Sequence, residues 1–278
     1  MTTTGQGSWL ASDDLALALR AADVADAVSL PGFESRSFRV DHKADASEVT
    51  EIDRNTESAL SELLRRERPD YSLYGEEHGV IGPTDAARQW VIDPIDGTSN
   101  FVRGVPVWAT LIALVEDGTP MLGVVSAPAL GRRWWAVRGG GAFCGKIGAS
   151  VDPLRDAIRL RVSDVASLDA ASASITVTES WHRASKTTQL DSLQRDVKRL
   201  RNYGDFWQHM LVAEGAVDFA IDAIGLGPYD NAAIYPIVTE AGGQVSDRHG
   251  APDYRSNSLI TSNGRLHAAV IGVLEGDR

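Results

Sequence analysis

The sequence predicts an α+β protein, because helical and strand patterns occupy separate stretches of the chain. Apolar residues recur at helical spacing over residues 12–30 and 52–66. Between residues 107 and 143 the pattern changes to short apolar runs divided by glycine-containing turns, which is typical of an antiparallel meander. Two more helical patterns follow at residues 204–219 and 230–241.

The two N-terminal helices have recognisable ends. Ser12 or Asp13 can cap the first helix, which we expect to end at Leu30. The second helix, residues 52–66, stops before Pro69. Asp53 lies in the first turn of this second helix, where a carboxylate can point out of the helix end.

A turn-forming sequence follows the first strand. Residues 89–92 are strand-like, and Asp-Pro-Ile-Asp-Gly comes next at residues 93–97. We therefore expect the strand to end at Ile92, which leaves Asp93 and Asp96 at its end. The strands of the meander after it are expected at residues 107–115, 121–126 and 133–137.

The C-terminal part of the chain mixes the two patterns. Pro236 lies inside the last helical pattern and lacks the N–H that an internal helix bond needs, so we expect a bend or a late helix start there. We place a domain boundary near residues 145–150, between halves at 1–147 and 148–278. The second half is expected to contain strands at residues 158–162 and 173–177 and helices at residues 189–198, 204–219 and 230–241.

Composition excludes several classes of protein. With 278 residues, of which 43% are apolar, the chain can bury a large core as one domain or as two of about 130 residues. The 38 acidic residues outnumber the 27 basic ones, and no block of Lys and Arg could neutralise a nucleic acid. Cys144 is the only cysteine, and neither a signal-peptide pattern nor a membrane-spanning run is present, so we expect a cytoplasmic protein.

Three short segments offer carboxylates without basic neighbours in the sequence. They are Glu76-Glu77, the segment from Asp93 to Thr98, and Asp230. Taken singly, these are ordinarily solvated surface, a surface turn and a helix N-cap. Taken together, they provide the oxygen ligands that Mg²⁺ prefers, so the sequence predicts a magnesium site.

Longer motifs around these acids resemble the inositol monophosphatase family. The resemblance rests on Gly75-Glu76-Glu77, on residues 90–101, on Tyr229-Asp230-Asn231-Ala232-Ala233 and on Glu240-Ala241-Gly242-Gly243, in this order. The upstream residues Lys43, Thr50 and Asp53 are also similar to the family's pattern. Within the family, residues 100–109 and 123–135 resemble the histidinol-phosphate phosphatases of actinobacteria most closely.

The resemblance implies a layered α-β-α-β-α sandwich, a homodimer and two or three Mg²⁺ ions per site. Because phosphate esters are repelled by an acidic protein, bound cations would also explain how this chain accepts them. The first ion would be held by Glu76, Asp93 and the Ile95 carbonyl, and the second by Asp93, Asp96 and Asp230. The catalytic residues implied are Thr98, Asp53 and Glu77, of which Thr98 and Asp53 would orient the attacking water.

Substrate contacts are expected from a further set of residues. The backbone N–H groups of Gly97 and Thr98 would bind the phosphate if they open a helix. Asp205 stands where inositol-selective members have a small neutral residue, and it either favours a cationic substrate or caps a helix. Further expected contacts are Asp230, Tyr229, which replaces the usual Trp, and the possible accessory residues Lys43 and Asp222.

The activity implied by the resemblance is Mg²⁺-dependent hydrolysis of L-histidinol phosphate, a small-molecule phosphate monoester, in histidine biosynthesis. The alternatives within the class are an inositol-1-monophosphatase or a promiscuous sugar phosphatase. Outside the class, the chain could be an inactive regulator that binds a metal or ligand on the same fold.

Overall fold

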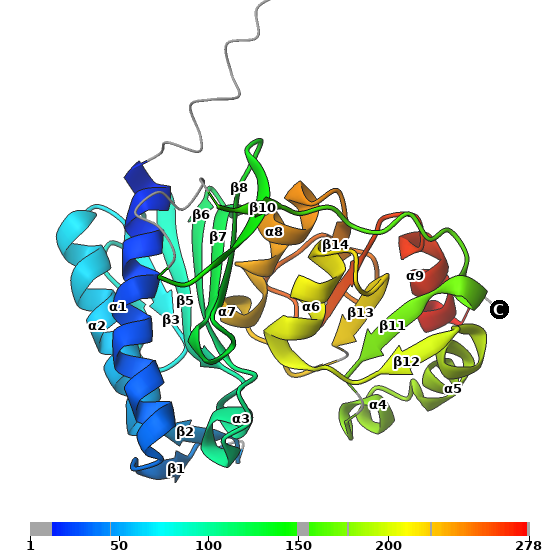
Figure 1. The fold of residues 1–278 in the computed structure, drawn as a ribbon, viewed down its shortest axis with the longest axis horizontal. Coiled ribbons are helices and arrows are strands. Elements are labelled where there is room, and N and C mark those ends of the chain that lie inside the picture. Colours follow the sequence, from blue (N-terminus) through cyan, green and yellow to red (C-terminus); the bar gives the residue numbers. More distant parts are fainter. Residues whose placement is uncertain (1–12, 45, 149–155, 177, 223, 277–278) are drawn as a thin grey trace, which may run out of the picture.

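In the described part of the chain, two large β-sheets alternate with three layers of helices, as Figure 1 shows. The structure is a computed structural model, and it describes residues 13–44, 46–148, 156–176, 178–222 and 224–276. Helices α1 and α2 cover the outer face of the first sheet, α6, α7 and α8 lie between the sheets, and α4, α5 and α9 cover the second sheet. The predicted α-β-α-β-α sandwich is confirmed.

The outer layer consists of α1 (Asp13–Ser35) and α2 (Glu51–Glu67), as Figure 1 shows in blue and cyan. Leu15, Leu17 and Leu60 bury one side of this pair against sheet residues such as Trp90. The expected end of the first helix at Leu30 is wrong, because α1 continues through Pro31 to Ser35. Its last turn is stabilised by Phe33, whose ring packs on Phe101 and Trp108 at centroid distances of 5.5 and 5.4 Å.

The first sheet has eight strands in the order β10-β9-β8-β7-β6-β5-β3-β4. Among the described residues of this sheet, only β3 and β5 pair in parallel and the other neighbours are antiparallel, so the predicted meander is present. A separate two-stranded sheet pairs β1 (Val40–His42) with β2 (Glu48–Thr50). The eight strands are β3 (Ser72–Gly75), β4 (Gly79–Ile81), β5 (Arg88–Asp96), β6 (Ala109–Glu116), β7 (Thr119–Ala127), β8 (Arg132–Val137), β9 (Gly141–Lys146) and β10 (Ile158–Arg159).

Strand β5 does not end at Ile92, so that expectation is wrong. It continues to Asp96, and its register against β6 shifts between Asp93 and Asp96. Such a bulge accommodates Pro94, which has no N–H to donate to a neighbouring strand. The carbonyl of Pro94 accepts a hydrogen bond from Thr110 Oγ1 at 2.8 Å, which holds the bulged segment on the sheet.

The middle layer contains α6 (Asp205–Ala213), α7 (Pro228–Asn231) and α8 (Ile234–Glu240). The helix expected over residues 204–219 ends early, because Gly215 turns the chain at a φ of +72° and β13 begins at Phe219. The late start expected near Pro236 is observed. Pro236 is the third residue of α8, where its missing N–H leaves no helix bond unmade.

The second sheet has five strands in the order β12-β11-β13-β15-β14, with β11 parallel to both of its neighbours. The strand expected over residues 158–162 is reduced to β10, which belongs to the first sheet. The strands are β11 (Ser172–Ile175), β12 (Arg199–Arg201), β13 (Phe219–Asp222), β14 (Gln244–Ser246) and β15 (Leu259–Ser262), and the covering helices are α4 (Ser180–Arg183), α5 (Thr187–Asp196) and α9 (His267–Glu275).

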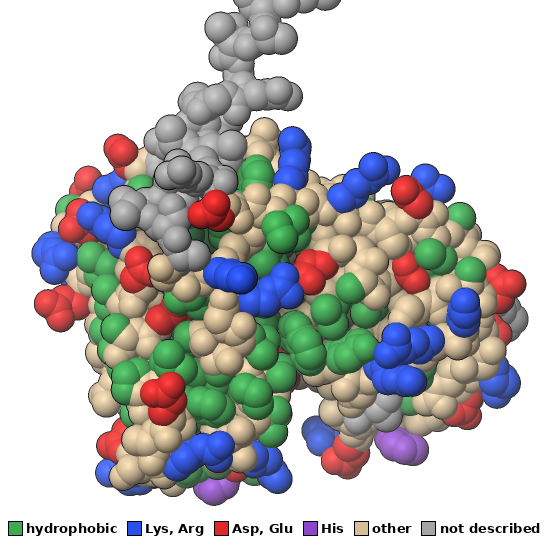
Figure 2. Space-filling view, in the orientation of Figure 1, with side chains coloured by type: hydrophobic (Ala, Val, Ile, Leu, Met, Phe, Trp, Pro, Cys, Tyr) green, Lys and Arg blue, Asp and Glu red, His purple; other side chains and the backbone are tan. Residues whose placement is uncertain are grey.

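The described surface has no dominant charge on the face drawn in Figure 2, where basic and acidic side chains are interspersed. Within the described residues, none of the helices combines the length and the apolar character that a membrane crossing requires. The division into halves at 1–147 and 148–278 stays a prediction, and Ser12 and residues 149–155 lie outside the described residues.

Candidate metal centre

Three carboxylates converge where β5 meets α7. One oxygen from each of Asp93, Asp96 and Asp230 lies within 4.8 Å of the others. The register shift in β5 lies between the first two acids, and the third is on the short helix α7. Asp96 Oδ2 accepts a hydrogen bond from the Phe206 N–H, and Asp230 Oδ2 accepts one from the Gly227 N–H, each at 2.6 Å. Backbone groups therefore fix the orientation of two of the three acids.

Burial and mutual repulsion disfavour the charged forms of these acids. Burial raises the pKa of Asp93 well above its usual range, and the charges of Glu76, Asp96 and Asp230 raise it further. Burial and the nearby charge of Asp205 do the same to the pKa of Asp96. Burial raises the pKa of Asp230 to about 7, although the hydrogen bond from Gly227 opposes this shift.

Glu76 joins the cluster from the end of β3, close to Asp93. Besides burial, the charge of Glu76 raises the pKa of Asp93 and of Asp230, and one oxygen of Asp93 lies within 4.8 Å of one of Asp230. Like-charged carboxylates this close are stable only when a proton or a cation offsets their repulsion. An all-oxygen donor set of this kind fits a hard divalent cation such as Mg²⁺.

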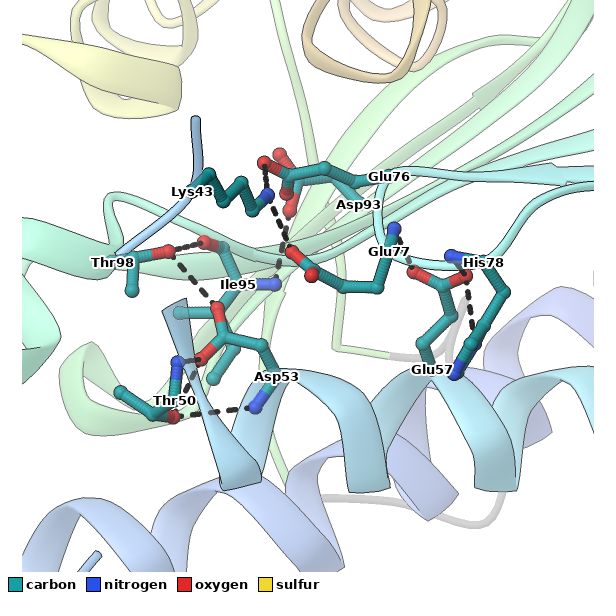
Figure 3. A network of polar contacts seen from close by, with 10 residues as sticks. All are labelled: Lys43, Thr50, Asp53, Glu57, Glu76, Glu77, His78, Asp93, Ile95 and Thr98. Atoms are coloured by element: carbon teal, nitrogen blue, oxygen red, sulfur yellow. Dashed lines mark hydrogen bonds and ion pairs between the residues drawn. The ribbon is translucent and has the colours of Figure 1, made fainter. Parts of the chain in front are cut away.

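Lys43 supplies positive charge on the other side of the same segment. Its Nζ lies 2.7 Å from Glu76 Oε1 and 2.6 Å from Glu77 Oε1, as Figure 3 shows. Burial lowers the pKa of Lys43, but the two carboxylates outweigh this effect and the pKa is raised overall. One ammonium group cannot balance all the acids of the cluster, so the site retains a need for cations.

Thr98 and Asp53 form a hydrogen-bonded pair beside the cluster. Thr98 Oγ1 lies 2.9 Å from Asp53 Oδ1 and 3.0 Å from the Ile95 carbonyl oxygen (Figure 3). The second oxygen of Asp53 accepts hydrogen bonds from the N–H and hydroxyl of Thr50, which caps α2. Asp53 is fully buried, and burial raises its pKa. Through its bond to Thr98, Asp53 faces the start of α3 (Thr98–Arg103).

Asp205 lies next to Gly97, which directly precedes α3. Its Oδ2 accepts a hydrogen bond of 2.8 Å from Asn100 Nδ2, and a Cβ on Gly97 would lie only 3.4 Å from the same oxygen. Burial and then the charge of Asp222 raise the pKa of Asp205 to about 6. The alternative interpretation of Asp205 as a helix cap is wrong, because Gly204 occupies the N-cap position of α6.

Tyr229 packs against another aromatic ring, whereas Asp222 lies in a hydrogen-bonded network at the end of β13. The ring of Tyr229 packs edge-on against Tyr74 at 6.0 Å, and burial together with the charges of Glu76 and Asp230 raises its pKa. Asp222, at the end of β13, accepts a hydrogen bond from Gln208 Nε2 and lies 3.0 Å from His209 Nε2. The metal-type cluster found among the described residues does not include Asp222.

Two polar partners in this region escaped the sequence analysis. Asn100, which binds Asp205, lies far from it in the chain, so its role has no local signal. Glu57 is fully buried and accepts hydrogen bonds from the N–H groups of Glu77 and His78. It follows Asp53 by one helical turn on the buried face of α2, but the sequence alone does not show which backbone groups it binds.

The layered fold and the buried carboxylate cluster define a metal-dependent hydrolase of phosphate monoesters. The chain belongs to the inositol monophosphatase family, whose pattern matches residues 11–276. The histidinol-phosphatase of Mycobacterium tuberculosis is 47% identical over 262 residues, which cover 94% of this chain and 98% of the relative. The histidinol-phosphatase of Streptomyces coelicolor is also 47% identical, over 266 residues that cover 94% and 97% of the two chains.

A solved structure supports the same assignment. The IMPase of Thermotoga maritima superimposes with a TM-score of 0.81 at 32% sequence identity. The match covers 95% of this chain and 98% of that protein, so the layers described above are common to both.

Proposed function

We propose that this protein hydrolyses L-histidinol phosphate to L-histidinol and phosphate, with Mg²⁺ held by the carboxylate cluster. The observation that carries the proposal is the convergence of Asp93, Asp96 and Asp230 in a chain that is 47% identical to two histidinol-phosphatases. Since every predicted acidic ligand is present, an inactive regulator is the weaker hypothesis.

The metal ligands would divide into two groups that share Asp93. Glu76, Asp93 and the Ile95 carbonyl would hold one ion, and Asp93, Asp96 and Asp230 would hold another. When bound, Mg²⁺ lowers the pKa of water and neutralises charge on the phosphate oxygens. Asp93 suits the shared position, because one of its oxygens lies within 4.8 Å of oxygens of Asp96 and Asp230, and the charge of Glu76 also acts on it.

Thr98 and Asp53 would prepare the attacking water. When the Thr98 hydroxyl donates its proton to Asp53, the lone pairs of Oγ1 are free to accept a hydrogen bond from water. Asp53 is anchored by Thr50, and its raised pKa suits a group that takes up a proton. Glu77, which lies beside this pair, would add a second acceptor. The water oxygen forms a bond to phosphorus, the ester P–O bond breaks, and the proton released by water ends on the leaving alcohol.

The phosphate and the remainder of the substrate would contact different residues. The N–H groups of Gly97 and Thr98 open α3 and would donate to phosphate oxygens. Asp205 would face the cationic amine or imidazole of histidinol phosphate, and Tyr229 would form an apolar wall. Lys43 and Asp222 would contribute indirectly, through the charges of Glu76 and Asp205.

A panel of phosphate monoesters assayed with Mg²⁺ tests the proposed substrate. We expect histidinol phosphate to be hydrolysed with a higher kcat/KM than inositol 1-phosphate or sugar phosphates. The Asp205→Asn variant should raise KM for histidinol phosphate and leave neutral substrates unaffected, and Asn tolerates the local φ of +48°. Faster turnover of inositol 1-phosphate by the wild-type protein would assign the alternative activity.

The metal assignment is tested by Asp93→Asn, with Asp70→Asn as the matched control. Asp70 is exposed on a turn, so its substitution should change neither Mg²⁺ binding nor activity. Removing the charge of Asp93 should abolish Mg²⁺-dependent hydrolysis. Unchanged activity in Asp93→Asn would contradict the predicted ligand set.

We also propose that the protein is a cytoplasmic homodimer that folds as the two halves 1–147 and 148–278. The family resemblance and the single buried Cys144 support these proposals. Light scattering coupled to size-exclusion chromatography would measure the dimer, and a monomer at micromolar concentration would refute it.

A further inference from the structure

We propose that Glu57 is a positioning residue that holds the segment 75–78, and with it Glu76 and Glu77, against the carboxylate cluster. The inference rests on the proposed function. Glu57 lies in the middle of α2, its side chain is 0% exposed, and its carboxylate accepts hydrogen bonds from backbone N–H groups of the segment 75–78. A buried acid of this kind requires a specific set of donors.

The donors are backbone groups of the segment that carries the ligands. The Glu77 N–H donates to Glu57 Oε2 and the His78 N–H donates to Glu57 Oε1, both at 2.8 Å. The ring of His78 adds a contact of 3.1 Å from Nδ1 to Oε1 (Figure 3). Because both carboxylate oxygens bind consecutive peptide groups, they fix the position and the direction of this backbone.

Gly75 makes this approach possible. A Cβ built on Gly75 would lie 2.1 Å from Glu57 Oε1 and 2.4 Å from its carboxyl carbon. Any larger residue would therefore push the Glu57 carboxylate away from the segment. The glycine is needed here for close packing, and its φ is not in the left-handed region.

Helix α2 joins this segment to the other side of the site. Asp53 and Glu57 are four residues apart, so their side chains leave the helix on the same face. Asp53 binds Thr98, while Glu57 binds the backbone that carries Glu76 and Glu77. One rigid helix thus sets the separation between the predicted water-orienting pair and two of the predicted acids.

The positioning contact also opposes electrostatic repulsion. Besides burial, the charge of Glu76 raises the pKa of Asp93, so the two carboxylates repel each other when both are charged. Lys43 binds the carboxylates of Glu76 and Glu77, whereas Glu57 binds the backbone N–H groups of Glu77 and His78. Without Glu57, the backbone of the segment would be free to relax away from the cluster, and the cation affinity of the site would fall.

The test is the isosteric variant Glu57→Gln, with Glu62→Gln as the control. Glu62 lies on the same helix and is exposed, so the control makes the same chemical change away from the segment. The Gln amide presents N–H groups to a backbone N–H, so one of the two contacts is lost. We expect Mg²⁺ affinity, measured by calorimetry on the metal-free protein, to weaken roughly 10- to 100-fold in Glu57→Gln only.

Two further readouts separate positioning from general stability. Amide hydrogen exchange at Glu77 and His78 should accelerate in Glu57→Gln without Mg²⁺, and kcat should recover at saturating Mg²⁺. The variant Gly75→Ala, which keeps the carboxylate but displaces it, should show the same weakened Mg²⁺ affinity. A lower melting temperature with unchanged Mg²⁺ affinity in both variants would overturn the proposal.

The outcomes also distinguish this proposal from the proposed function. If wild-type protein and Glu62→Gln bind Mg²⁺ but hydrolyse no phosphate monoester, the proposed function fails, while the affinity and exchange data still decide the role of Glu57. If wild type is an active phosphatase and Glu57→Gln matches it in Mg²⁺ affinity and exchange, only the role of Glu57 is refuted.

Discussion

His267 should make the folded protein sensitive to acid. Its side chain is 3% exposed at the start of α9, and its two ring nitrogens lie 2.8 Å from Ser246 Oγ and 2.9 Å from Ser262 Oγ. Burial lowers its pKa from 6.5 to about 4. As the pH falls below 6.5, His267 becomes protonated in the unfolded chain but stays neutral in the folded protein until the pH approaches 4. The free energy of unfolding therefore decreases over this range.

The size of the effect follows from the two pKa values. Between pH 7 and pH 4.5, linkage predicts a loss of about 2 kcal/mol in the free energy of unfolding from this one group. Urea denaturation at both pH values would measure it in wild type and in His267→Gln, which cannot be protonated. The control is His182→Gln, since His182 is exposed on α4. If wild type and His267→Gln lost the same free energy between the two pH values, the reasoning would be refuted.

Three further predictions concern metal binding and packing. Mg²⁺ at about 100 times its dissociation constant should stabilise the wild-type protein by about 2.7 kcal/mol in thermal denaturation, because it binds only the folded state, and Asp93→Asn should abolish this gain. Gly123→Ala should lower the free energy of unfolding in urea by about 1–3 kcal/mol, because the added Cβ would lie 2.1 Å from the Ala233 carbonyl oxygen. Its control is Gly272→Ala, which has open space around it and should leave stability unchanged or raise it. Asp26→Ala should lower the free energy of unfolding in urea by about 3–5 kcal/mol, because buried Arg133 loses the carboxylate that lies 2.7 Å from its guanidinium. Asp23 also binds Arg133 but is exposed, so an equal loss of stability in Asp23→Ala would contradict this explanation.

Elements with strong periodicity were predictable from the sequence, and those set by tertiary contacts were not. The second helix and the meander were expected close to their observed bounds, because apolar spacing alone determines which face they bury. The continuation of α1 past Pro31 was missed, since it depends on aromatic contacts of Phe33 with residues far along the chain. The end of β5 was misplaced because Asp-Pro-Ile-Asp-Gly has the composition of a turn but lies in a bulged strand.

In the candidate site, too, some residues were predictable from the sequence and others depend on tertiary contacts. The acids that line up with known motifs could be named in advance, and the structure brings Asp93, Asp96 and Asp230 together. The residues that hold these acids in place could not be named in advance, because Asn100 and Glu57 act through contacts between separate elements. A buried glutamate on a helix has the same local sequence signal as an exposed one until its neighbours are known.

The spacing of Asp53 and Glu57 on α2 restricts how this helix can change in length. An insertion of one residue between them would rotate the later part of the helix by about 100°, and Glu57 would face away from the segment that it binds. Insertions and deletions here would therefore be tolerated only after Glu57, towards Glu67, where the helix no longer contacts the site. Homologous chains should accordingly vary in the C-terminal length of α2 while the interval from Thr50 to Glu57 stays constant.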